Sequence, residues 1–171
     1  MKLLKVIGLL VFGFTTSLSL SQNQETLSEI NEQVWKPFTT AYETLDANLF
    51  ASIHSKDLVR VSGNNKLVSN FESYISRFKS HWENLDRKQT ISFRFFERIN
   101  SEDKASETGV YKLTINPGTK DEISYYGKFH VILVKKETVW KILVDYDANL
   151  NNSIDESTYQ AAYAIDDFSK Y

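Results

Sequence analysis

Apolar and polar residues alternate along the chain from Gln89 to Tyr146, and this pattern limits the possible folds more than any other feature of the sequence. A period of two places neighbouring side chains on opposite faces of a strand. The pattern predicts strands at Gln89–Ile99, Lys104–Ile115, Glu122–Lys135 and Val139–Tyr146. Because the segments that join them are too short for anything but antiparallel neighbours, the strands must form a meander.

The segment before the meander has apolar residues at helical spacing. Apolar residues recur at every third or fourth position along Gln24–Leu45 and predict a long amphipathic helix. Pro37 lies inside this helix, where it removes one backbone N–H and clashes with the preceding turn, so we expect a bend at Gln33–Pro37. Asp46 can then cap a short second helix that carries Leu49, Phe50 and Ile53.

The remaining segments complete an α+β pattern. A short hairpin is expected next, with a strand, a turn and a return strand at Leu58–Ser62, Gly63–Asn65 and Lys66–Val68. Ser69–Glu72 fits a capping box for a helix whose apolar stripe runs from Phe71 to Leu85. Asp155 can cap a final helix that extends to about Phe168. Helices on one face of a long, strongly curved antiparallel sheet form an α+β fold, and a bent helix closing such a sheet leaves a hollow.

The first 21 residues have the features of a secretory signal peptide. Lys2 and Lys5 form a positive start, an apolar stretch follows to Phe14, and the small residues Ser19 and Ser21 precede Gln22 at a cleavage site. An uncleaved membrane anchor needs about 20 apolar residues, and the second half of this stretch is too rich in serine and threonine. We therefore expect residues 22–171 to form one domain that is periplasmic or secreted, without a stable membrane anchor.

Composition excludes several kinds of chemistry. The chain has 20 basic and 22 acidic residues, so it offers no positive field for nucleic acid. It has no cysteine, which removes disulfides, thiolate nucleophiles and cysteine metal sites. The only histidines, His54, His81 and His130, are too widely spaced for a local metal motif, and we expect neither a metal nor another cofactor.

One segment imitates a calcium-binding loop. Asp145–Glu156 spaces its oxygen-bearing side chains as an EF-hand loop does. Leu150 occupies the position that requires glycine, and a strand precedes the segment instead of a helix. We interpret it as a polar loop between a strand and a helix, with Asp155 as the helix cap.

Four stretches carry a resemblance to a known superfamily. They are Trp35–Asp46, Leu49–His54, Tyr126–Lys135 and Val139–Asp145. With them, residues 27–148 resemble the nuclear transport factor 2-like superfamily, and within it the SnoaL-like branch, which is also similar to ketosteroid isomerase. The resemblance implies a conical α+β barrel with an internal pocket, and a two-fold dimer. It implies no single activity, because members include isomerases, cyclases, dehydratases, transport factors and proteins without known activity.

The catalytic positions of the isomerase branch are only partly kept. The resemblance places its oxyanion-binding tyrosine at Phe38 and its general-base aspartate at Ser62, and both functional groups are absent. The protonated acid of the branch falls near His130, whose imidazole can still donate a hydrogen bond. A shift of one or two residues would bring Tyr42 or Arg60 into these roles instead.

The hollow is expected to exceed ~300 Å³, the lower end for small-molecule sites. Its wall should draw on aromatic residues and one imidazole, namely Trp35, Phe38, Tyr42, Trp82, Phe96, Tyr126 and His130. Arg94 lies between two phenylalanines and is either a pocket cation or a solvated side chain; the aromatic residues are either ligand contacts or core. The outer face, with Val131, Leu133 and Leu143, would be covered by a second copy of the chain.

Three hypotheses about function follow. The first is an exported protein that binds a small hydrophobic or weakly acidic molecule, with His130 or Arg94 orienting it. The second is an enzyme of proton transfer on a carbonyl compound, with His130 as acid or base and Asp145 or Tyr42 in support. The third is a dimerisation module without a pocket. The absent isomerase side chains favour the first.

Overall fold

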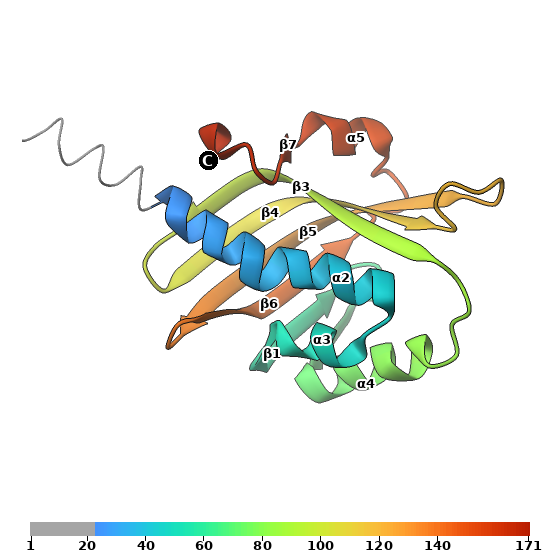
Figure 1. The fold of residues 1–171 in the computed structure, drawn as a ribbon, viewed down its shortest axis with the longest axis horizontal. Coiled ribbons are helices and arrows are strands. Elements are labelled where there is room, and N and C mark those ends of the chain that lie inside the picture. Colours follow the sequence, from blue (N-terminus) through green and yellow to red (C-terminus); the bar gives the residue numbers. More distant parts are fainter. Residues whose placement is uncertain (1–22) are drawn as a thin grey trace, which may run out of the picture.

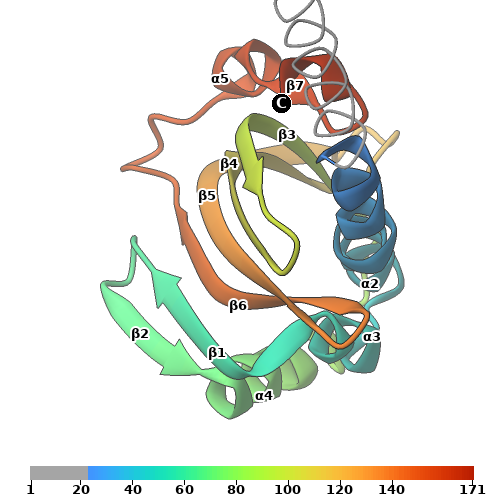
Figure 2. The same cartoon turned by 90° about the vertical axis from the view of Figure 1, so that its left-hand side faces the viewer.

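A curled seven-stranded sheet forms the body of the protein, with strand order β2-β1-β6-β5-β4-β3-β7. Its strands are β1 (His54–Ser62), β2 (Leu67–Asn70), β3 (Gln89–Asn100), β4 (Lys104–Ile115), β5 (Ile123–Lys136), β6 (Val139–Ala148) and β7 (Tyr163–Ala164). Figure 2 shows the sheet curling from β2 round to β3 without closing on itself. The predicted α+β class and curved sheet are confirmed, and the four meander strands lie where alternation placed them.

The computed structural model describes residues 23–171. The signal peptide expected at residues 1–21 lies outside the described residues. Within residues 23–171, every helix is too short or too polar to cross a membrane.

The first helix lies across the sheet (Figure 1), on the open side of the curl (Figure 2). Residues 23–30 are α-helical, a π-helical turn (η1) occupies Asn31–Trp35, and α2 continues over Lys36–Thr44. Pro37 has no N–H to donate to the carbonyl of the preceding turn, and the helix absorbs this with the wider π turn, in which Lys36 N–H donates to Asn31 O. The irregularity thus falls in the segment where proline predicted it. This helix contacts both β3 and β6 across the hollow.

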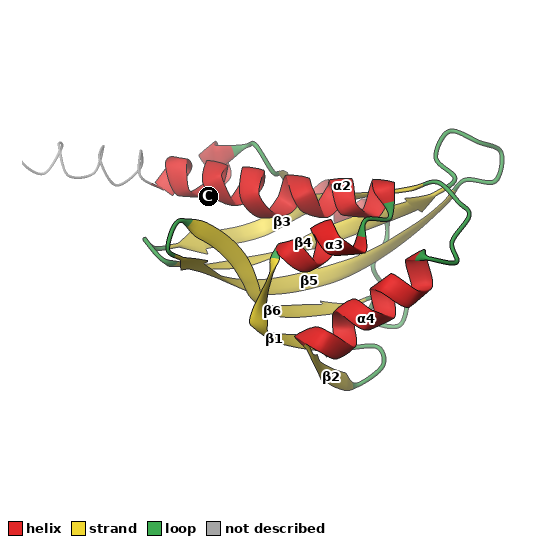
Figure 3. Ribbon diagram, turned by 60° about the horizontal axis from the view of Figure 1, so that its bottom comes forward, coloured by secondary structure: helices red, strands yellow, loops and turns green. Residues whose placement is uncertain are grey.

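Three shorter helices follow along the chain, and Figure 3 shows the first two of them below the first helix. They are α3 (Ala47–Ser52), α4 (Phe71–Trp82) and α5 (Glu156–Ala161). Asp46 caps α3 and Asp155 caps α5, as predicted, each by accepting backbone N–H groups. The cap of α4 is Asn70 and not Ser69, because the Asn70 side chain reaches Ser73 N.

The C-terminal segment differs from its prediction. Helix α5 ends at Ala161 instead of continuing to about Phe168, and the chain becomes extended at Ala162. It then adds β7 to the edge of β3 opposite Arg94 and Phe95, and finishes in a 3-10 turn (η2, Phe168–Lys170). Two arginines of β3 cause this path, because they donate to the carbonyls of Ala162 and Ile165.

Strand β5 shows which face of the sheet points inward. Val131 and Leu133 are only 2% and 0% exposed and pack into the core with Phe129. The expectation that they lie on the outer face is therefore wrong. Alternation then places His130 on the outer face, where it is exposed.

A bulge in β6 also changes which residues of that strand face inward. Val144 pairs with Ile132 and Ile142 with Leu133, so Leu143 is an extra residue in the ladder. Trp140 and Ile142 face the core before the bulge, and Asp145 and Asp147 face it afterwards. The bulge thereby turns two carboxylates into the hollow.

Candidate functional site

A small cavity of about 90 Å³ lies between the first helix and the concave face of the sheet. Aromatic and polar side chains from helices and strands line it: Trp35, Phe38, Tyr42, Arg60, Tyr74, Ile91, Phe93, Tyr111, Leu113, Phe129, Val131, Asp145 and Asp147. The expected volume of ~300 Å³ is not reached. The reason is aromatic packing, since the Trp35 ring lies 4.7 Å from that of Phe93 and 5.2 Å from that of Phe129, centroid to centroid.

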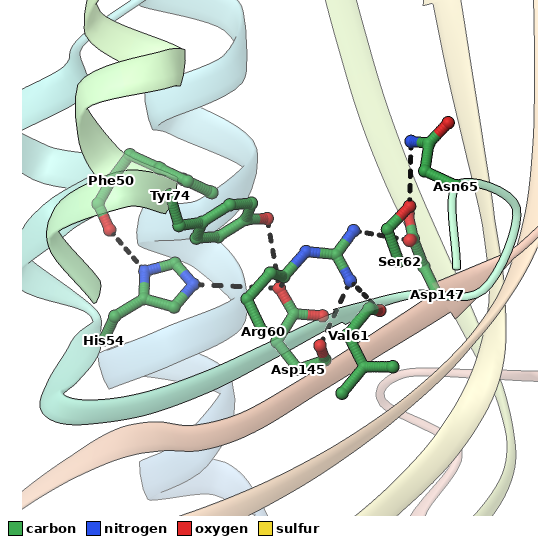
Figure 4. Close-up of polar contacts among 9 residues, drawn as sticks. All are labelled: Phe50, His54, Arg60, Val61, Ser62, Asn65, Tyr74, Asp145 and Asp147. Carbon is green, nitrogen blue, oxygen red and sulfur yellow. Dashed lines mark hydrogen bonds and ion pairs between the residues drawn. The ribbon is translucent and has the colours of Figure 1, made fainter. Parts of the chain in front are cut away.

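A cluster of charged groups forms the floor of the cavity (Figure 4). The Arg60 guanidinium, on β1, donates to the Asp147 carboxylate and to the main-chain oxygens of Val61 and Asp145. Its Nε lies 3.6 Å from Asp145 Oδ2. Tyr74 of α4 donates its hydroxyl to the same oxygen at 3.1 Å. Parallel pairing of β1 with β6, which sets Arg60 beside Asp145, creates the cluster.

His54 lies behind Asp145 and completes the cluster. Its Nδ1 is 2.7 Å from Phe50 O, so this nitrogen carries the proton and donates it. Its Nε2 then presents a lone pair, has no hydrogen-bond partner within the described part of the chain and lies 4.0 Å from Asp145 Oδ2. Burial lowers the pKa of His54 to about 4, which keeps the imidazole neutral at neutral pH.

Burial and the charges of the cluster set the protonation of the other groups. Desolvation raises the pKa of Asp145 and of Asp147, and the adjacent Arg60 guanidinium opposes this rise. Desolvation also raises the pKa of Tyr42, and that of Tyr111 to about 12. Both phenols are therefore neutral at physiological pH and can donate or accept a hydrogen bond from a bound molecule.

The structure brings some of the predicted site residues together. Trp35 and Tyr42 line the cavity beside Phe38, and Asp145 lies in its floor. Trp82 does not reach the cavity; it is buried in the core, with its ring 5.2 Å from Tyr42. The predicted site residues that do meet at the cavity therefore come from the first helix and from β6.

Other predicted residues lie on the opposite face of the sheet. His130 is exposed, with Nε2 2.9 Å from Ser106 Oγ, and the Phe96 ring is covered by the Lys128 ammonium group. Both were expected in the cavity wall. Alternation along β5 places His130 on the outer face instead. Phe96 is the extra residue at a bulge of β3 between Phe95 and Glu97.

Two further predicted residues contact the C-terminal segment instead of the cavity. Arg94 Nε donates to Ala162 O at 2.7 Å, and its guanidinium lies over the Tyr159 ring. The Tyr126 hydroxyl donates to Glu156 Oε2 at 2.5 Å. Both are held by the region around α5.

Of the positions that were compared with catalytic residues of isomerases, some reach the cavity and others do not. Phe38 lines the cavity, whereas the Ser62 hydroxyl accepts a hydrogen bond from Asn65 at the surface. Tyr42 and Arg60, which a shifted register would select, both reach the cavity. Arg60 was missed as a primary candidate, although alternation with Leu58 along β1 was the available signal of its inward orientation.

The segment that imitates a calcium loop is used for other contacts. Asp145 and Asp147 face Arg60, and Asp155 caps α5. Leu150 adopts a positive φ of 48°, and the two asparagines after it also have positive φ values. Within residues 23–171, no three His, Asp or Glu side chains are grouped as metal ligands.

Comparison with known proteins gives structural neighbours only. No protein-family model matches the sequence, and no curated protein matches it significantly. A nuclear transport factor 2-like protein of unknown function from Shewanella oneidensis matches with a TM-score of 0.58 and 18% identity, over 70% of this chain and 96% of that one.

Other neighbours have provisional enzyme names. A provisionally named scytalone dehydratase from Novosphingobium aromaticivorans matches with a TM-score of 0.63 and 12% identity, over 74% of this chain and 86% of that one. A provisionally named ketosteroid isomerase from Shewanella frigidimarina matches with a TM-score of 0.55 and 16% identity, over 71% and 97%. At such identities the likeness establishes a shared fold and no shared activity.

Proposed function

We propose that this chain, which has the nuclear transport factor 2-like fold, is an exported protein that binds a small molecule in the cavity under its first helix. The observation that carries the proposal is the combination of an aromatic wall with the Arg60–Asp145–Asp147 cluster in one cavity. Burying charged groups costs several kcal/mol per ion, so such a cluster is a poor way to stabilise a core. Aromatic surface with a few converging polar groups is typical of ligand sites.

The size of the cavity limits the ligand. A volume of about 90 Å³ is well below the ~300 Å³ at which typical small-molecule sites begin. The ligand that fits without side-chain movement therefore has only a few non-hydrogen atoms. A larger ligand would have to displace one of the aromatic rings of the wall.

Tryptophan fluorescence can test the proposal, because Trp35 lines the cavity and Trp82 does not. We expect saturable quenching by at least one member of a panel of small acids, ketones, alcohols and amines. The Trp35→Phe variant should lose this signal.

Two neighbouring residues of β5 provide a matched control. Val131 lines the cavity, and the next residue, Ile132, projects from the other face of the sheet. Val131→Phe should fill the space and abolish quenching, whereas Ile132→Phe should preserve it; circular dichroism and melting would confirm that both variants fold. If Val131→Phe does not fold, Leu113→Phe fills the same cavity. A panel that gives no saturable response would instead favour the dimerisation module.

A second candidate function is proton transfer on a carbonyl compound. Asp145 favours it, because this carboxylate faces the cavity with a raised pKa and contacts the Tyr74 phenol. His130 lies on the other face of the sheet, so Asp145 would be the base. In this case Asp145→Asn should stop deuterium exchange at the α-carbon of a bound ketone and leave binding intact, while His130→Ala changes neither. Exchange that persists in Asp145→Asn would exclude this role.

A further inference from the structure

We infer that the molecule bound in this cavity carries a small alkylammonium group. This inference rests on the proposed function, because it names the chemical class of the ligand for the same cavity. Its basis is the excess of negative charge on the floor, together with the aromatic wall above it.

The charge count of the cavity is negative. Of the residues that line it, Arg60 is the only cation, whereas Asp145 and Asp147 are both acids. The remaining ionisable lining groups are phenols, which are neutral at physiological pH. With its carboxylates ionised, the site is one positive charge short of balance.

Two of the three guanidinium nitrogens are already hydrogen-bonded. Arg60 Nη1 donates to the main-chain oxygens of Val61 and Asp145, and Nη2 donates to Asp147 Oδ1. The third nitrogen, Nε, is buried 3.6 Å from Asp145 Oδ2 and has no hydrogen-bond partner among residues 23–171. An anionic ligand would add a third negative charge beside the two carboxylates that this guanidinium already faces.

Asp147 provides a free acceptor on the floor. Its side chain is 30% exposed, and only its Oδ1 pairs with the guanidinium, which leaves Oδ2 for a ligand. An ammonium group supplies the N–H donor that this acceptor lacks.

The walls are suited to the same ligand. Aromatic faces attract cations through their quadrupole, and the attraction grows when the cation is removed from water. The rings of Trp35, Phe38 and Phe93 surround the space, with centroids 4.7 to 6.0 Å apart. The small volume favours a short, branched alkyl group over a long chain.

The test compares three compounds that share an isopropyl group: isopropylammonium, 2-propanol and isobutyrate. Each would be titrated at neutral pH and constant ionic strength, following Trp35 fluorescence and calorimetry. We expect isopropylammonium to bind at least about tenfold more tightly than 2-propanol, and isobutyrate to bind most weakly.

Asp147→Asn removes the surplus charge but keeps an oxygen that accepts from Arg60. It should abolish the preference for isopropylammonium over 2-propanol. Asp57→Asn is the matched control, because Asp57 pairs with Lys136 on the surface, away from the cavity. It should change neither affinity.

The outcomes separate this inference from the proposed function. If isobutyrate or 2-propanol binds best, the inference about the ligand is wrong, and the proposal that the protein binds a small molecule stands. If the preference for isopropylammonium survives in Asp147→Asn, the charge argument is wrong. If none of the three quenches Trp35, the inference fails, and failure of the wider panel as well would overturn the proposed function.

Discussion

His54 is fully buried and neutral, and this makes the stability of the protein depend on pH. Its pKa is about 4 in the folded chain and about 6.5 when unfolded, so unfolding takes up a proton between these values. The free energy of unfolding should therefore decrease as the pH falls from about 6.5 to about 4, by roughly 3 kcal/mol in total.

Urea unfolding of the wild-type protein and of His54→Gln across this pH range would measure the effect. The raised pKa values of Asp145 and Asp147 act in the opposite direction, because these acids gain protons in the folded state first. They are present in both proteins, so the difference between the two curves isolates His54. A difference that does not shrink toward pH 4 would contradict the assignment.

Among single residues of the site, those that belong to a long periodic pattern were easier to predict than those placed by the tertiary fold. Trp35 and Tyr42 were predictable because their helical spacing marks one face of a helix. Alternation with Leu58 could show that Arg60 points inward. No local pattern shows that β6, from the far end of the chain, lies beside Arg60 and His54. Their role depends on parallel pairing of β1 with β6, which is a property of the tertiary fold.

Several elements of the structure meet at one buried ion pair. Arg98 of β3 and Glu107 of β4 form a fully buried salt bridge at 2.8 Å. Glu107 also accepts from the Trp35 indole at 2.6 Å, and Arg98 donates to Ile165 O in the C-terminal segment. The pair thus connects the sheet, the first helix and the chain end.

Glu107→Gln should destabilise the protein by about 3–5 kcal/mol, because it leaves the buried Arg98 charge without a counter-ion. Asp57→Asn breaks an exposed pair with Lys136 and should cost less than about 1 kcal/mol. Chemical unfolding at neutral pH would compare the two. Equal effects would show that the buried pair contributes nothing beyond an ordinary surface contact.

Element types were predictable where a period lasted long enough. The meander strands and Asp155 as a helix cap followed from alternation and side-chain chemistry. The two-residue strand β7 was not predictable, because no period can be recognised over that length. The inward face of β5 was also hidden, since alternation shows which residues share a face and not which face meets the helices.

The bulge in β6 shows a further limit of periodicity. Leu143 is the extra residue, and it shifts the inward positions from Trp140 and Ile142 to Asp145 and Asp147. A strict period of two would have assigned these pairs to opposite faces. Nothing in the local sequence signals such a shift.

For the molecule as a whole, we propose export with removal of residues 1–21. The prediction is that mature protein recovered from the periplasm or medium begins at Gln22. Intact-mass measurement of the exported material would check it. A mass that retains Met1 or Lys2 would refute cleavage.

We also propose a homodimer, with a different contact surface from the one first expected. Val131 and Leu133 are buried in the core, so the outer face must offer other apolar groups. Ile99, 57% exposed, lines a shallow groove on that face with Ile132. Light scattering should give twice the monomer mass, and Ile99→Lys should give the monomer with unchanged ligand binding. A wild-type monomer at micromolar concentration would refute the dimer.

The parallel pairing of β1 with β6 has a consequence for the order in which the protein folds. Strands β3 to β6 are joined by short turns and can associate early, because closing short loops costs little entropy. Arg60 is 85 residues from Asp145, so β1 must dock across a long loop. We expect this docking to be late, and changes at Arg60 to accelerate unfolding more than they slow folding. If the chain is exported as we propose, its cavity would then be assembled last, after the meander strands have crossed the membrane.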